Sequence, residues 1–111
     1  TKELEKIPGV ITPGNFSRNE HTYHLYIIKI TEQFAKKRDK VFSELKNHGI
    51  QVTVHYKPLH KFSAYKKLAK ISELLNNSKR IYNEILTLPF YPGISKKEQD
   101  IVIKNLKKLN N

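Results

Sequence analysis

The sequence predicts a small α/β domain of the α+β type, with a sheet of about three strands packed against three to four helices. Runs rich in β-branched and aromatic residues alternate with runs in which apolar residues recur at helical spacing. Proline and glycine separate these runs. The chain has 111 residues, of which 38% are hydrophobic, and this supplies one modest core. We therefore expect one domain.

The first 20 residues are expected to form a connection without a secondary-structure element. Pro8-Gly9 and Pro13-Gly14 lie within it, and both dipeptides are typical of turns and loops. The run from Tyr23 to Ile30 that follows is rich in β-branched and aromatic residues, and both of its faces are largely apolar. This pattern predicts a central strand that is covered on both sides.

A helix and a second strand are predicted next. Apolar residues at helical spacing predict a helix from Arg38 to His48, and Gly49 is well placed to end it in the left-handed conformation. Apolar and polar residues alternate from Ile50 to Tyr56, which predicts a strand. Pro58 ends this strand because proline has no N–H group for a ladder hydrogen bond.

The last third of the chain is predicted to hold further helices and a short strand. The expected ranges are helices over 64–75 and 77–85, and a strand over 86–88 that Pro89 ends. Ser95 and Glu98 form a capping box that starts the final helix. The residues of that helix expected to point inward are Val102, Ile103, Leu106 and Leu109.

Composition excludes several classes of site. The chain has no cysteine, which excludes disulfides, thiolate metal sites and cysteine nucleophiles, and we expect a cytoplasmic protein. No apolar run is long enough to span a bilayer, and no signal-peptide pattern is present. The net charge is +11, but 18 of the 21 basic residues are scattered lysines. This pattern is typical of a solvated surface, so we expect no nucleic-acid or membrane partner.

The residues that could carry chemistry gather between Gly49 and His60. A strand that ends in His-Tyr-Lys-Pro-Leu-His would place donors, a cation and an aromatic ring at a sheet edge, where a polar anionic ligand could bind. Alternatively, Tyr56 is a core residue, and His55 and His60 bond backbone carbonyls. No metal-ligand set, paired carboxylates, nucleophile elbow or glycine-rich phosphate loop is present. We therefore predict no catalytic, cofactor-binding or metal-binding residue.

Several short motifs occur in a fixed order along the chain. They are His21-Thr22-Tyr23-His24-Leu25-Tyr26, Arg38-Asp39, Gly49-Ile50, His55-Tyr56-Lys57-Pro58-Leu59-His60, Tyr65 and Leu88-Pro89-Phe90-Tyr91-Pro92. This set resembles the carboxyl-terminal domain of the DegT/DnrJ/StrS aminotransferases, from about His21 onward. Enzymes of that family depend on pyridoxal phosphate (PLP) and aminate nucleotide-linked keto-sugars.

The resemblance implies the small domain of a fold-type I aminotransferase. Residues 1–20 would then be a linker from an amino-terminal domain absent from this chain, and residues 21–111 the carboxyl-terminal small domain. In the family, the cofactor lysine and most phosphate contacts lie in the amino-terminal domain. We therefore expect PLP in the intact enzyme, and a fragment that binds no PLP and is inactive alone.

The resemblance also implies which residues contact the substrate. His55 and Tyr56 would face the active-site cleft and contact the nucleotide sugar, and His60 is a weaker candidate. The intact enzyme would be a homodimer that transfers an amino group, usually from glutamate. Two alternatives stay open: a basic nucleotide- or nucleic-acid-binding module, and a non-catalytic scaffold domain.

Overall fold

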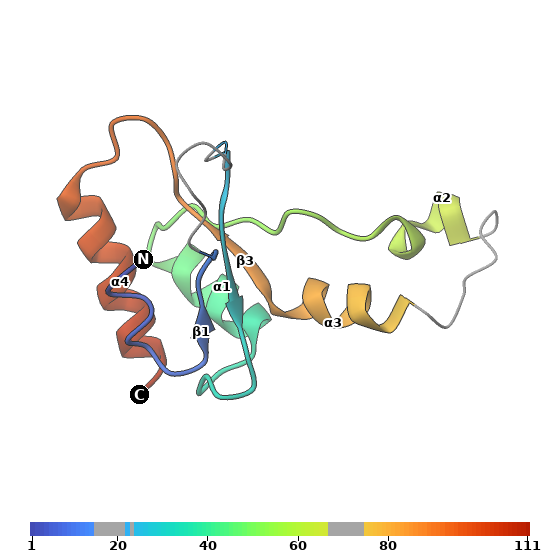
Figure 1. Ribbon diagram of the computed structural model, residues 1–111, viewed down its shortest axis with the longest axis horizontal. Helices are drawn as coiled ribbons and strands as arrows, with labels where there is room; N and C mark the ends of the chain where they lie inside the picture. Colours follow the sequence, from blue (N-terminus) through green and yellow to red (C-terminus); the bar gives the residue numbers. More distant parts are fainter. Residues whose placement is uncertain (15–21, 23, 67–74) are drawn as a thin grey trace.

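A computed structural model describes residues 1–14, 22, 24–66 and 75–111 of the chain. It holds a three-stranded antiparallel sheet in the order β1-β2-β3, together with four α-helices and a 3-10 helix (Figure 1). The strands are β1 (Val10–Ile11), β2 (Tyr26–Ile30) and β3 (Ile85–Leu88). The helices are α1 (Arg38–Asn47), η1 (Leu59–Lys61), α2 (Ser63–Lys66), α3 (Asn76–Glu84) and α4 (Lys96–Leu109). The predicted α+β class is confirmed.

The core lies between the sheet and helices α1 and α4. Helix α1 packs against both α4 and β3, and all four residues of β3 are buried. Strand β2 is central, as predicted, but Ile28 and Ile30 are buried while Tyr26, Ile27 and Lys29 are only half-buried. Strand β2 is therefore buried at Ile28 and Ile30 but only partly covered on its other face, where the expected cover is incomplete.

The predicted strand from Ile50 to Tyr56 is not a strand. Ile50 and Val52 are buried as the alternation predicts, but the segment pairs with the sheet only through an antiparallel bridge between Thr53 and Thr87. The next bonded positions on β3 would be residues 85 and 89. Pro89 has no N–H, and the N–H of Ile85 already bonds the carbonyl of Ile81 at the end of α3. Neither position therefore has an N–H group available to extend the ladder.

The expectation that residues 1–20 contain no element is also wrong. Leu4 and Ile7 are buried in the core, and Val10 pairs with Ile30 in the β1–β2 ladder. Gly9 has a φ of 77°, and its carbonyl accepts a hydrogen bond of 2.8 Å from the backbone N–H of Thr31. The Pro8-Gly9 dipeptide thus shapes a turn that leads into a strand of two residues, too short to show an alternation.

The predicted ends of two helices are confirmed. Gly49 follows α1 with a φ of 74°, and the N–H of Ile50 donates to the carbonyl of Leu45 at 3.0 Å, as in a Schellman motif. Ser95 and Glu98 form the capping box of α4. Of the four residues expected to point inward from α4, three are buried and Ile103 is half-buried. Parts of two other predictions, the strand start at Tyr23 and the helix over 64–75, lie outside the described residues.

Candidate functional site

The predicted site residues lie at the base of an extension that we call the arm, defined as residues 54–66 and 75–84. The arm consists of an extended segment, η1, α2 and α3, and it projects away from the sheet and from α4 (Figure 1). Its two halves leave and rejoin the body at the Thr53–Thr87 bridge and at the start of β3. The contacts of the chain with β3 therefore determine where the arm begins and ends.

His55 is held at this base by two hydroxyl groups. Its Nδ1 atom lies 3.0 Å from Oγ1 of Thr87 and 3.2 Å from Oγ1 of Thr53. Thr87 is a buried residue of β3, whereas Thr53 is exposed. These two contacts orient the imidazole ring of His55 relative to the sheet.

Tyr56 is next to His55 in space as well as in sequence. The two rings meet edge to face with their centroids 4.7 Å apart, and the peptide bond between the residues is cis. Tyr56 is 68% exposed. The alternative that Tyr56 is a core residue is therefore wrong, and the His55–Tyr56 pair presents an aromatic surface to the outside of this domain.

His60 is placed differently, within the 3-10 helix η1. Its Nε2 atom is buried and has no hydrogen-bond partner among the described residues. In that part of the chain, a ring contact joins His55 to Tyr56, but none joins either residue to His60. The described hydrogen bonds include none from His55 or His60 to a backbone carbonyl, so the alternative of a carbonyl-bonding role has no support. The structure thus brings two of the three predicted residues together.

Two lysines of the arm lie over aromatic rings. Nζ of Lys57 lies 4.8 Å from the ring centroid of Phe62, and Nζ of Lys61 lies 4.4 Å from that of Tyr82. The second contact joins η1 to α3, so it connects the two halves of the arm. The arm also exposes several large apolar side chains, namely Tyr56, Leu59, Phe62, Tyr65 and Ile81.

A buried arginine anchors the arm to the body. Arg38, the first residue of α1, is 8% exposed, and its guanidinium group donates to the carbonyl of Tyr82 at 2.7 Å and to that of Asn83 at 3.4 Å. These carbonyls belong to the last turn of α3, where no intrahelical donor is available. This role was not predicted from the sequence. One signal was available: Arg38 is one of only three arginines among 21 basic residues.

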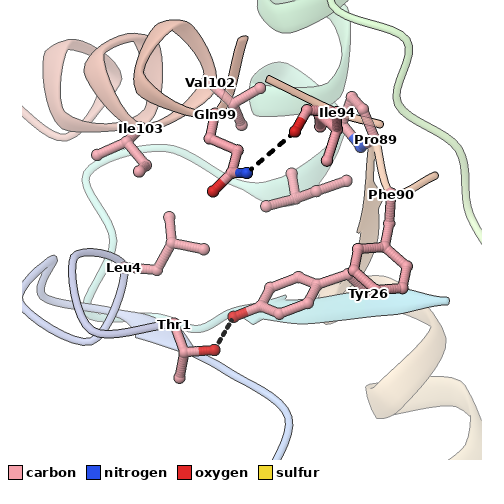
Figure 2. Close-up of a pocket in the computed structure, with 10 residues that line it drawn as sticks. Thr1, Leu4, Tyr26, Pro89, Phe90, Ile94, Gln99, Val102 and Ile103 are labelled. Carbon is pink, nitrogen blue, oxygen red and sulfur yellow. Dashed lines mark hydrogen bonds between the residues drawn. The ribbon is translucent and has the colours of Figure 1, made fainter. Parts of the chain in front are cut away.

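A separate pocket of about 240 Å³ lies between the amino-terminal segment, β2 and α4 (Figure 2). Its lining is mostly apolar, and the hydroxyl of Tyr26 bonds Oγ1 of Thr1 at 2.8 Å at one edge. Burial raises the pKa of Tyr26 above its ordinary value. None of His55, Tyr56 and His60 lines this pocket. It therefore offers a hydrophobic hollow without a set of catalytic groups.

The lysines whose exposure the structure describes are exposed or half-buried. A Schiff-base lysine requires a buried environment that tunes its amine, and none of these lysines is buried. Within the same described ranges, no group of three or more His, Cys, Asp or Glu side chains could hold a metal ion. None of the described helices is long and apolar enough to cross a membrane.

The fold and the site together define a small α+β domain that presents a His–Tyr pair at the base of a projecting arm. The chain belongs to the DegT/DnrJ/EryC1/StrS aminotransferase family, whose model matches residues 1–107. The family is PLP-dependent.

Relatives with known names support this assignment. The chain is 33% identical over 104 residues to the spore coat polysaccharide biosynthesis protein SpsC of Bacillus subtilis, covering 91% of this chain and 27% of the relative. It is 34% identical over 102 residues to a UDP-4-amino-4,6-dideoxy-N-acetyl-beta-L-altrosamine transaminase of Campylobacter jejuni, with the same two coverages. The PLP form of the putative sugar aminotransferase Spr1654 of Streptococcus pneumoniae superposes with a TM-score of 0.82 at 26% identity, covering 98% of this chain and 28% of that one.

These comparisons also bear on the extent of the chain. It spans about a quarter of the length of the curated relatives that it matches. The predicted family and the predicted fold class are confirmed. The division into a linker over residues 1–20 and a domain over residues 21–111 stays a prediction, as do the roles of His55, Tyr56 and His60.

Proposed function

We propose that this chain is the carboxyl-terminal small domain of a PLP-dependent aminotransferase that transfers an amino group, usually from glutamate, to a nucleotide-linked keto-sugar. The observation that carries the proposal is the family match over residues 1–107, together with relatives that are named as sugar-nucleotide transaminases. In the whole enzyme, PLP supplies the electron sink for amino transfer. The lysine that holds it would lie outside this chain, which alone would bind no PLP and be inactive.

The role of this domain would be to form one wall of the substrate cleft. His55 and Tyr56 would contact the nucleotide sugar, since the Tyr56 ring is 68% exposed and the His55 ring is held in place by two hydroxyl groups. His60 would be a weaker contact, and its unpaired Nε2 could bond a group supplied from outside the described residues. Holding the sugar in a reactive orientation is a contribution that a domain without a cofactor site can make.

The exposed side chains of the arm support a larger assembly. Apolar side chains that cluster on a surface mark sites of interaction, and the arm exposes Leu59 by 67% and Tyr65 by 48%. In the proposal, the arm packs against other parts of a homodimeric enzyme near the active site. A cytoplasmic location is also part of the proposal, in keeping with a chain that has no cysteine.

The test is to express the full-length product of the gene that contains this chain. It should show PLP absorbance and aminate a keto-sugar nucleotide with glutamate as donor. Tyr56→Ala and His55→Ala should each raise KM for the sugar nucleotide by about tenfold, the effect of losing about 1.4 kcal/mol of binding. A full-length product without PLP would overturn the proposal. Unchanged kinetics in both variants would favour a scaffold role for this domain.

A further inference from the structure

Thr87 links the core of the domain to the candidate site. It lies in β3 and is 4% exposed, and both of its backbone groups are used by Thr53: the N–H of Thr87 donates at 2.8 Å and its carbonyl accepts at 3.2 Å. Its side-chain hydroxyl lies 3.0 Å from Nδ1 of His55. Among the described residues, this imidazole nitrogen is the only hydrogen-bond partner of that hydroxyl.

The two neutral tautomers of His55 differ in whether the Thr87 hydroxyl has an acceptor for its hydrogen. A hydroxyl carries one hydrogen to donate, and a buried donor left without an acceptor is costly. If Nδ1 carries the ring proton, it donates to Oγ1 of Thr87, and the hydroxyl hydrogen of Thr87 has no acceptor among the described residues. If the ring proton is on Nε2, Nδ1 is an acceptor and the Thr87 hydroxyl donates to it.

The buried Thr87 hydroxyl therefore favours the tautomer with the proton on Nε2, and Thr53 does not reverse this preference. Its hydroxyl is also close to Nδ1, at 3.2 Å, but Thr53 is exposed and can bond water in either tautomer. Nδ1 has a single lone pair and accepts one hydrogen bond. The Thr87 hydroxyl is nearer to it and is buried, so an unmade bond would cost more for Thr87 than for Thr53. The choice of tautomer therefore depends on Thr87.

We propose that Thr87 is a positioning residue that holds His55 in the tautomer with the proton on Nε2, so that the ring presents an N–H donor to an oxygen acceptor of the bound ligand. Nε2 of His55 has no partner among the described residues and is not one of their buried unpaired atoms. It is the ring atom left to meet a ligand. The identity of that ligand as a nucleotide sugar, whose hydroxyl, carbonyl and phosphate oxygens are acceptors, rests on the proposed function.

The tautomer can be measured directly by two-bond ¹H–¹⁵N correlation spectra of the 111-residue chain at pH 8, where histidine is ordinarily neutral. We expect the Nε2–H pattern for His55. Thr87→Val should raise the proportion of the Nδ1–H form by about tenfold. The valine has no hydroxyl, so the Nδ1–H form no longer leaves a buried donor at position 87 without an acceptor. Thr87→Ser keeps the hydroxyl and should keep the pattern, and Thr53→Val should shift it far less.

An Nδ1–H pattern in the unmodified chain would overturn the inference, whether or not any variant folds. A Thr87→Val variant with a native amide spectrum and an unchanged tautomer ratio would also overturn it.

The effect of Thr87 on ligand binding through His55 is tested in the full-length gene product. Thr87→Val should raise KM for the sugar nucleotide about tenfold with kcat nearly unchanged, and Thr87→Ser should restore KM. If the product aminates the sugar but Thr87→Val leaves KM unchanged, the positioning role is refuted. If the product aminates no sugar nucleotide while the spectra show the Nε2–H form, the proposed function fails and the tautomer assignment stands.

Discussion

Replacing Arg38 by methionine should loosen the attachment of α3, the second half of the arm, to the body of the domain. Methionine keeps most of the alkyl stem of the side chain, so the change removes mainly the guanidinium group. That group donates to the carbonyls of Tyr82 and Asn83, which terminate α3, and its carbon lies 5.4 Å from the ring centroid of Tyr82. The ion pair of Arg38 with Asp39 matters little, because Asp39 is 87% exposed.

The cost can be worked out from these contacts. A hydrogen bond from a charged donor contributes about 1.5–3 kcal/mol. The attraction between a cation and a helix carboxyl terminus adds about 0.3–1 kcal/mol. The bond to Tyr82, at 2.7 Å, is short, whereas that to Asn83, at 3.4 Å, is long and contributes less. We expect Arg38→Met to lower the free energy of unfolding by about 2–4 kcal/mol.

Urea unfolding of the 111-residue chain is the assay, followed by circular dichroism and by tyrosine fluorescence, since the chain has six tyrosines and no tryptophan. With an m-value of about 2 kcal/mol per M, the midpoint should fall by about 1–2 M. Arg80→Met is the matched control: Arg80 is exposed on α3, and its described hydrogen bond is a long one, 3.5 Å, to Asn77. If Arg38→Met costs less than about 0.5 kcal/mol, or no more than the control, the guanidinium contacts do not anchor α3.

Two further predictions concern glycine and the start of α4. Gly9→Ala should lower the free energy of unfolding by more than about 3 kcal/mol, because an added Cβ would lie 2.2 Å from the backbone nitrogen of Phe34. Gly49 has a similar φ but nothing within 4 Å of an added Cβ, so Gly49→Ala should lower it by about 1–2 kcal/mol. Equal losses of stability in urea unfolding would contradict this prediction. The Ser95 hydroxyl, its backbone N–H and Tyr91 lower the pKa of Glu98 to about 2. Glu98 therefore stabilises the fold above its ordinary pKa of 4.5, and this contribution disappears as the pH falls toward 2. Glu98→Gln should lose less stability than the unmodified chain between pH 5 and pH 2, and parallel curves would refute the assignment.

Local signals in the sequence were enough to predict the elements whose ends are determined by short-range contacts. The end of α1 at Gly49 and the start of α4 at Ser95 depend on residues within five positions of each other. The segment from Ile50 to Tyr56 could not be predicted in the same way. Its alternation correctly indicated that Ile50 and Val52 are buried. Whether it forms a ladder depended on Pro89, far along the chain, and on the N–H of Ile85.

The same distinction applies to the site. Residue types pointed to the segment from Gly49 to His60, and the family resemblance singled out His55 and Tyr56 within it. The structure brings these two residues into contact. The residues that hold them could not be predicted from the sequence. Thr87 is 32 positions from His55, and only the folded structure brings the two side chains together. The pairing of Arg38 with the carbonyl of Tyr82 spans 44 positions and involves a backbone group, which carries no sequence signal.

Two separate sets of long-range contacts hold the arm against the body of the domain, and we call them anchors. The Thr53–Thr87 bridge and the Thr87 hydroxyl hold the first half of the arm and the ring of His55 against β3. Arg38 holds the second half against α1. The two halves meet through Lys61 and Tyr82, whose ring also contacts Arg38.

Because the anchors lie on different elements, their loss should have separable effects. Loss of the Thr87 hydroxyl changes the donor that His55 presents but leaves the guanidinium contacts of α3 in place. Loss of Arg38 frees the end of α3, and through Tyr82 and Lys61 it disturbs η1, which carries His60. The Thr87 anchor thus determines which ring nitrogen of His55 is a donor, and the Arg38 anchor determines the position of α3 in the second half of the arm.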